Sequence, residues 1–280
     1  MTMENNDLTL ITGGNGKTGR RLAERMIAAR RPVRIGSRGA TPAFDWEDRA
    51  TWAGALDGVS AVYVAFQPDL TVPGALETLT ALYAQALAAG ARKLVLLSGR
   101  GEEEAQAAER ALQATGADWT ILRATWFSQN FSEGHFLEPL QEGELALPVG
   151  AVPEPFIDVE DIADVAFAAL TQPGHSHRLY ELTGPRALTF AEVVAEIAAA
   201  TGREISFAAI PAQDYRAALE EAQVPADLTD LVLHLLTTVL DGRNTPVAHG
   251  VRQALGREPR DFSEYVRQTA ATGVWGGTHA

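Results

Sequence analysis

The residues best suited to chemistry are the glycines of an N-terminal loop. The loop has the sequence Thr12-Gly13-Gly14-Asn15-Gly16-Lys17-Thr18-Gly19 and directly follows the apolar run 8–11. Gly13 would allow a sharp turn out of a strand, and Gly16 would allow backbone N–H groups to approach a pyrophosphate. Gly19 would allow a helix to pack closely on the sheet, and the first N–H groups of that helix favour an anion. The loop therefore predicts a dinucleotide site, with contacts expected from Gly13, Asn15, Gly16, Lys17, Thr18 and Gly19.

The end of the second predicted strand indicates which dinucleotide is bound. NAD sites usually place Asp or Glu about 20 residues past the loop, where it binds the ribose hydroxyls. Here the strand 33–36 is followed by Ser37 and Arg38 instead. A hydroxyl and a planar guanidinium suit a 2′-phosphate, so the sequence predicts NADP(H) in preference to NAD(H). The alternative is that Arg38 is a solvated loop residue.

The elements that would position these residues alternate between strand and helix through the first 125 residues. Strands separated by helices of 10–15 residues imply βαβ units and a parallel sheet. The fold class predicted is α/β, a Rossmann-type doubly wound parallel sheet with a smaller, mostly helical C-terminal substrate domain. Further strands are expected at 61–65, 94–98 and 119–123, a short one at 44–46, and helices at 50–56, 73–89 and 102–115.

The alternation ends near residue 124. Residues 124–155 carry aromatic residues, glycines and prolines and are expected to form loops with a short helix, which would contribute to a pocket. The predicted Rossmann domain covers 1–150, and segment 156–183 returns to it. The predicted substrate-side domain covers 184–280 and would fold over the carboxyl edge of the sheet. Thr189 and Glu192 form a capping-box pattern that begins one of its helices. The elements expected after residue 155 are strands at 156–158, 179–182 and 205–209 and helices at 160–170, 189–200, 213–222, 228–240, 247–255 and 262–271.

Composition excludes several classes of protein. The chain has 280 residues, 46% of them hydrophobic, and a net charge of −13. An acidic chain argues against nucleic acid or an anionic membrane as partner, and the absence of cysteine excludes disulfides. No apolar run reaches the length of about 18 residues that a membrane span needs. The N-terminus is polar and acidic, so we expect a cytoplasmic protein. The many alanines and only two lysines suggest a bacterial source.

Several stretches of the chain together resemble one family. These stretches are 12–19, 107–112, 119–131, 156–163, 180–185 and 255–260. They resemble the NmrA-like branch of the atypical short-chain dehydrogenases/reductases. Within that branch they are most similar to the NADPH-dependent quinone oxidoreductase and agroclavine dehydrogenase types. The resemblance implies a Rossmann core that binds NADP(H), next to a small C-terminal substrate domain.

The resemblance also implies further site residues. The loop after strand 61–65, with Ala65, Phe66 and Gln67, would flank the middle of the cofactor, and segment 125–131 would lie by the nicotinamide ring. Aromatic side chains near that segment could form a wall for a flat substrate. The alternative is that they belong to the core at the domain boundary. These aromatic residues are Trp126, Phe127, Phe131 and Phe156.

The usual catalytic pair of short-chain reductases is missing. In that pair a lysine lowers the pKa of a tyrosine four residues before it, so that the tyrosine can donate a proton. Here the positions four residues before Lys17 and Lys93 hold Gly13 and Ala89. Ser98, at the end of its strand, is a candidate cofactor contact and substrate-orienting hydroxyl, and His135 is a candidate proton donor. Glu109 matches a glutamate common in the branch and is interpreted as structural.

The predicted function follows from the missing pair. We expect an NADPH-preferring oxidoreductase that passes hydride to a small planar acceptor, quinone-like or imine-like, because such acceptors need little help from an acid. One alternative is an NADP(H)-binding redox sensor or regulator without turnover, and another is a non-redox biosynthetic enzyme. A small-molecule substrate is the expected partner, a homodimer is possible, and no metal is expected, because the histidines lack carboxylates at ligand spacing.

Overall fold

The computed structural model describes residues 7–276. Most of the polar N-terminal segment, on which the cytoplasmic expectation rests, lies outside that range. The chain divides into two compact units. The first contains residues up to Ala124 together with Val159–Leu182 and His249–Arg257, and the second contains Thr125–Asp158, Thr183–Ala248 and the residues from Glu258 onward.

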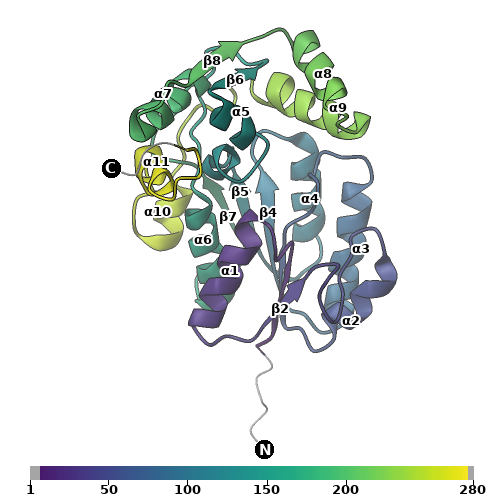
Figure 1. Ribbon diagram of the computed structural model, residues 1–280. Coiled ribbons are helices and arrows are strands. Elements are labelled where there is room, and N and C mark those ends of the chain that lie inside the picture. Colours follow the sequence, from purple (N-terminus) through teal and green to yellow (C-terminus); the bar gives the residue numbers. More distant parts are fainter. Residues whose placement is uncertain (1–6, 277–280) are drawn as a thin grey trace, which may run out of the picture. The chain divides into compact units, whose positions relative to one another are not determined.

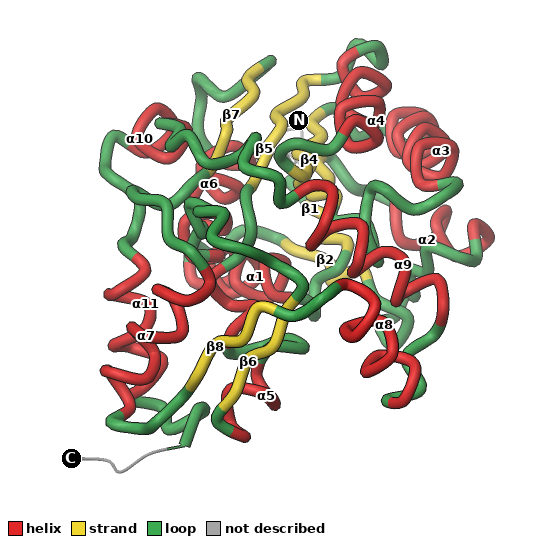
Figure 2. The backbone as a smooth tube through the Cα atoms, turned by 90° about the horizontal axis from the view of Figure 1, so that it is seen from above, coloured by secondary structure: helices red, strands yellow, loops and turns green. Residues whose placement is uncertain are grey.

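A parallel six-stranded sheet forms the centre of the first unit (Figures 1 and 2), which confirms the predicted Rossmann-type α/β class. The strand order is β2-β1-β3-β4-β5-β7. Strands such as Ala61–Val64 are buried along their whole length, because helices cover both faces of the sheet. The bounds are β1 Thr9–Thr12, β2 Val33–Gly36, β3 Ala61–Val64, β4 Lys93–Gly99, β5 Asp118–Ala124 and β7 Arg178–Leu182.

The helices of this unit lie in two layers. On one face α1 and α6 lie side by side, and α10 packs on α6 and β7. On the other face lie α2, α3 and α4, which cover a core that includes the buried Trp52 and Tyr83. The bounds are α1 Lys17–Ala28, α2 Trp52–Leu56, α3 Ala75–Ala88, α4 Glu103–Gln113, α6 Val159–Thr171 and α10 Gly250–Leu255. The strand predicted at 44–46 is wrong, because those residues form a loop before a 3₁₀ turn at Arg49–Thr51.

Ion pairs join the helices of the first layer. Arg25 binds Glu160 at 2.7 Å and Asp164 at 2.6 Å, so α1 is tied to α6. Arg257, just after α10, binds Asp164 and the fully buried Asp161, the latter at 2.7 Å. Acidic residues at the start of α6 also suit the positive end of its helix dipole. The segment containing α10, which the sequence suggested would belong to the C-terminal domain, therefore packs on the Rossmann sheet.

The second unit is built around an aromatic core. Phe131, Phe156, Phe190 and Phe262 pack against one another with ring centroids 5.3–5.9 Å apart, and Trp275 donates from its indole to the carbonyl of Phe131 at 2.7 Å. The unit contains a 3₁₀ turn at Ser128–Phe131, α5 Leu137–Glu142, β6 Glu144–Leu147, α7 Phe190–Thr201, β8 Ser206–Ala209, α8 Ala212–Glu221, α9 Ala226–His234, a π-helical turn at Leu235–Val239 and α11 Phe262–Ala270.

In this unit one strand prediction and one loop prediction are wrong, and the predicted capping box is confirmed. Segment 156–158 is not a strand, since only Ile157 makes a bridge, to Phe127. Strand β6, within a region expected to be loop, pairs in parallel with β8 in a separate two-stranded sheet. The capping box is confirmed: the Thr189 hydroxyl accepts from the Glu192 N–H at 3.2 Å, and the Glu192 carboxylate accepts from the Thr189 N–H at 2.8 Å.

A close contact between backbones fixes where α1 begins. A Cβ atom at Gly19 would stand 2.3 Å from the Gly13 carbonyl oxygen and 2.9 Å from the Gly14 Cα. Those atoms belong to the backbone of the preceding loop and cannot turn aside as a flexible side chain would. The helix can therefore start directly against the loop only because residue 19 is glycine.

We expect Gly19→Ala to lower the free energy of unfolding by about 1–3 kcal/mol, the usual cost of forcing an extra carbon into packed atoms. Gly150→Ala is the matched control, because a Cβ there meets no atom within 4 Å and the residue is not left-handed. Urea denaturation followed by circular dichroism measures both. Equal stability of the two variants would contradict the close-contact argument.

Candidate functional site

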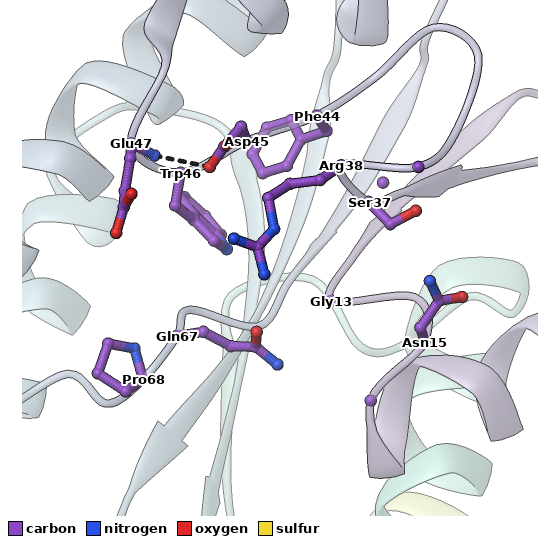
Figure 3. Close-up of a pocket in the computed structure, with 13 residues that line it drawn as sticks. Gly13, Asn15, Ser37, Arg38, Phe44, Asp45, Trp46, Glu47, Gln67 and Pro68 are labelled. Atoms are coloured by element: carbon purple, nitrogen blue, oxygen red, sulfur yellow. Dashed lines mark hydrogen bonds between the residues drawn. The ribbon is translucent and has the colours of Figure 1, made fainter. Parts of the chain in front are cut away.

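A cavity of about 670 Å³ opens at the carboxyl ends of β1 and β2 in the first unit (Figure 3). Ligands of open α/β sheets bind at this edge. Six of the predicted cofactor residues line the cavity: Gly13, Asn15, Gly16, Ser37, Arg38 and Gln67. The other lining residues are Gly36, Gly39, Phe44, Asp45, Trp46, Glu47 and Pro68.

The glycine loop has the shape that an anion site requires. Gly13 is left-handed at φ +62°, and a Cβ there would lie 3.3 Å from the carbonyl oxygen of Ala65. The Gly16 N–H donates to the Gly13 carbonyl at 2.8 Å, which closes the loop. Because Gly16 precedes α1 and has no side chain to cap it, the first N–H groups of the helix are directed at this loop. The backbone therefore fits a pyrophosphate.

Thr12 positions the loop that follows β3. It is not one of the predicted cofactor residues. Its hydroxyl donates to the carbonyl of Tyr63 at 3.1 Å and accepts from the N–H of Ala65 at 2.9 Å. These two bonds join the end of β1 to the end of β3. They bring Gln67 to the rim of the cavity, with its amide nitrogen 3.5 Å from where a Cβ of Gly16 would be.

The loop after β2 supplies the other wall of the cavity. The carbonyl of Ser37 accepts from the N–H of Phe44 at 3.0 Å, and the indole of Trp52 donates to the carbonyl of Asp45 at 2.6 Å. Trp46 packs edge-on against Phe44, with ring centroids 4.9 Å apart. These contacts hold residues 37–46 in a defined loop conformation.

Arg38 extends from this wall into the cavity, toward Trp46 and Gln67 (Figure 3). The side chain is exposed, so its charge is available to a ligand. Asp45 and Glu47 also line the cavity, but the Asp45 carboxylate already accepts from the Glu47 N–H at 3.1 Å. Trp46 was not among the predicted site residues, although the close spacing of Phe44, Trp46 and Trp52 indicates a folded aromatic loop.

The remaining predicted cofactor residues do not line this cavity. Thr18 is 5% exposed and turned inward, and Phe66 supports Trp46 from behind with ring centroids 4.8 Å apart. Ala65 faces Gly13 through its backbone. The residues outside the cavity lining are Lys17, Thr18, Gly19, Ala65, Phe66 and Ser98.

Ser98 belongs to a buried charge network. Its hydroxyl donates to Glu109 at 2.6 Å, and both side chains are at most 4% exposed. Arg123 donates to both oxygens of the same carboxylate, one at 2.9 Å, and also binds Glu181 at 3.1 Å. The hydrogen bonds that Arg123 donates to Glu109 raise the pKa of Arg123, so its guanidinium stays charged. Arg100 binds the other oxygen of Glu181 at 3.3 Å. The network ties α4 to β4, β5 and β7 at their carboxyl ends.

The aromatic residues predicted as a substrate wall are of two kinds. Phe131 and Phe156 are 0% and 2% exposed and belong to the core of the second unit, as the alternative interpretation of these residues expected. Trp126 and Phe127 are partly exposed. His135 is exposed, with its ring centroid 4.2 Å from that of Phe136.

Over residues 7–276, no group of three or more His, Asp or Glu side chains is arranged to hold a metal ion. Within the same range, none of the helices combines the length and the apolar character needed to cross a bilayer.

Comparison with known proteins identifies relatives along nearly the whole chain. The profile of a family described as NAD(P)H-binding matches residues 13–173. Agroclavine dehydrogenase of Claviceps fusiformis is 32% identical over 92% of this chain and 95% of its own. NAD(P)H azoreductase of Xenophilus azovorans is 29% identical over 94% and 98%. The structure of NADPH-dependent quinone oxidoreductase QOR2 from Escherichia coli, solved with NADPH, superposes with a TM-score of 0.78 at 20% identity, covering 93% of this chain and 99% of that one.

We expect Glu109→Ala to lower the free energy of unfolding by about 3 kcal/mol, because it removes the partner of the partly buried Arg123. Glu103→Ala, on the exposed side of the same helix, is the control and should stay within about 0.5 kcal/mol of wild type. Chemical denaturation monitored by circular dichroism gives both values. A Glu109 variant as stable as the Glu103 variant would show that the network does not stabilise the fold.

Proposed function

Because this chain belongs to the NAD(P)H-binding family, we propose that it is an NADPH-dependent reductase of a small planar acceptor, quinone-like or imine-like, that works without a Tyr-x-x-x-Lys pair. The observation that carries the proposal is the cavity in which the glycine loop and Arg38 face a common space. That space has backbone donors on one side and a fixed positive charge on the other.

The residues present fit a nicotinamide dinucleotide. The N–H groups around Gly16 and the start of α1 would hold the pyrophosphate. The side chains of Ser37 and Arg38 would bind the 2′-phosphate, and Trp46 offers an aromatic surface to the base. When bound, the cofactor supplies a hydride, and the protein contributes binding and orientation.

The preference for NADPH over NADH rests on charge. A guanidinium pairs with a phosphate through two parallel hydrogen bonds, which a ribose hydroxyl cannot match. The strand β2 ends in Gly36 and passes directly to Ser37 and Arg38, so no carboxylate stands at that strand end to bind a 2′-hydroxyl and repel a phosphate. Asp45 is the next acidic residue along the chain that lines the cavity. Its carboxylate accepts a hydrogen bond from the N–H of Glu47 in the same loop.

The acceptor class rests on what the chain lacks and on its relatives. With no tyrosine four residues before either lysine, the tyrosine that donates the proton in ordinary carbonyl reduction is missing. An acceptor that takes hydride readily would tolerate that loss. The relatives include proteins named for the reduction of azo compounds and of quinones, and such acceptors are planar and electron-poor. A sensor without turnover is the second candidate, favoured by the burial of Ser98 against Glu109.

We expect Arg38→Ala to raise the Kd for NADPH by roughly 10- to 100-fold, the loss of one charge-assisted contact, and to leave the Kd for NADH nearly unchanged. Arg92→Ala is the control, because Arg92 is exposed just before β4, at the opposite edge of the sheet. Isothermal titration with each cofactor measures the ratio. NADH binding as tight as NADPH binding in wild type, with the ratio unaltered in the Arg38 variant, would refute the preference.

We expect the purified protein to oxidise NADPH with quinones, azo compounds or cyclic imines and to leave unactivated ketones almost untouched. The measurement is the absorbance at 340 nm over a panel of these acceptors. Rapid reduction of simple ketones would contradict the acceptor class. Tight NADPH binding with no turnover on any acceptor would favour the sensor.

A further inference from the structure

The carboxyl group of Glu102 occupies an unusual place at the end of β4. Glu102 is the N-cap residue of α4, but its side chain makes no capping bond to that helix. Instead it folds back over the last residue of the strand. A Cβ at Gly99 would stand 2.2 Å and 2.3 Å from the two carboxylate oxygens. Gly99 therefore leaves the room in which this carboxyl group lies.

We propose that Glu102 is the proton donor of the reduction, in place of the missing tyrosine. The proposal rests on the proposed function and assigns one residue to it. Three features of the first unit support it. They are the position of Glu102 after the end of β4, the charged groups that surround it, and the lack of a hydrogen bond or ion pair at its carboxyl group. Within residues 7–276, no hydrogen bond or ion pair reaches its carboxyl group.

The position follows from the strand order. Arg38 lies at the end of β2, the glycine loop at the end of β1, and β3 separates β1 from β4. Neighbouring strands are about 4.8 Å apart, so the end of β4 lies on the order of 10 Å beyond the loop. The half of a dinucleotide that does not face Arg38 is directed toward this side of the edge. Glu102 thus lies at the strand end where the reacting half belongs.

The charged groups around Glu102 favour its protonated form. Burial raises its pKa to about 8, and repulsion by Asp69, Glu104 and Glu109 adds to the shift. Asp69, in the loop after β3, accepts from the N–H and hydroxyl of Thr71 at 2.9 and 2.8 Å.

The nearby arginines are engaged elsewhere. Arg123 binds Glu109 and Glu181, and Arg100 also binds Glu181. Neither guanidinium is therefore paired with Glu102. A carboxyl group that keeps its proton near neutral pH is the property that a general acid requires.

The proton balance defines which acceptors need Glu102. A quinone takes two electrons with the hydride and gains negative charge on oxygen. The O–H bond of Glu102 then breaks, its proton passes to that oxygen, and the remaining carboxylate regains a proton from water. An azo nitrogen needs a proton in the same way. An iminium ion becomes neutral on taking hydride and needs none, so its reduction should not depend on Glu102.

The test compares Glu102→Gln with Glu103→Gln, a neighbour that is exposed in the first turn of α4. The first readout needs no cofactor: carbon-13 NMR of glutamate-labelled protein should show one carboxyl titrating near pH 8 in wild type and in the control. That signal should be missing from the Glu102 variant. A carboxyl titrating near pH 4.5 at this position overturns the proposal.

The second readout is turnover at saturating NADPH. We expect Glu102→Gln to lower kcat with a quinone by about 100-fold, a typical contribution of a general acid, and to leave iminium reduction at the wild-type rate. The quinone rate of wild type should fall as pH rises through 8, and the variant should lack that dependence. The control should behave as wild type throughout.

Folding is checked in the same variants. Between pH 4.5 and about 8 the Glu102 carboxyl keeps its proton in the folded state and loses it in the unfolded state. Its contribution to the free energy of unfolding therefore becomes less favourable as pH rises through this range. Glu102→Gln should therefore melt at a higher temperature than wild type at pH 9 and gain less at pH 5. Unchanged quinone turnover in this folded variant overturns the donor role and leaves the reductase standing. Absence of turnover with every acceptor in wild type overturns the reductase, while the NMR titration still reports on Glu102.

Discussion

Contact between backbones at the glycine loop is the constraint on which the candidate site depends. Gly19 lies against Gly13 at a distance that leaves no room for a side chain, and the left-handed Gly13 lies in close contact with the carbonyl of Ala65. The start of α1 therefore meets the ends of β1 and β3 at one point. Because the N–H groups at a helix start carry partial positive charge, this point attracts an anion. The hydroxyl of Thr12 then fixes the spacing between the two strand ends.

Charged side chains at the carboxyl edge of the sheet differ between β2 at one end of the strand order and β4, β5 and β7 at the other. Arg38 is exposed at the end of β2, where it can meet a ligand. At the ends of β4 and β5 the arginines form ion pairs within the protein. Arg123 pairs with Glu109 and Glu181, and Arg100 pairs with Glu181. The network links β4, β5 and β7, and because its arginines are paired with Glu109 and Glu181, they do not pair with Glu102. One edge thus carries an available positive charge at one end and a protonated acid near the other.

Parts of the fold that depend on local patterns could be predicted from the sequence. The central strands are continuous apolar runs because both faces of the sheet are covered, and Thr189 with Glu192 determines a helix start by itself. The loop at 44–46 was signalled only in part by the nearby Trp52, because its shape also depends on Phe66, which comes after the next strand of the chain. Phe131 and Phe156 illustrate the same limit: an aromatic residue in the sequence gives no sign of whether other rings will cover it. Glu102 looked like any acidic residue at a helix start, and only its turn back over Gly99 distinguishes it.

An acidic chain can still bind an anionic cofactor, because binding responds to the local field. The net charge is −13, yet charges farther away than about 10 Å are largely screened at physiological salt. Within that distance the start of α1 supplies N–H donors and Arg38 supplies a full positive charge. Asp45 and Glu47 line the same cavity, and the Asp45 carboxylate accepts a hydrogen bond from the N–H of Glu47. The same short range of charge effects applies to Glu102, whose carboxyl pKa is raised by burial and by the nearby carboxylates of Asp69, Glu104 and Glu109. One sheet edge of an acidic chain can therefore bind a phosphate beside Arg38 and hold a protonated carboxyl at Glu102.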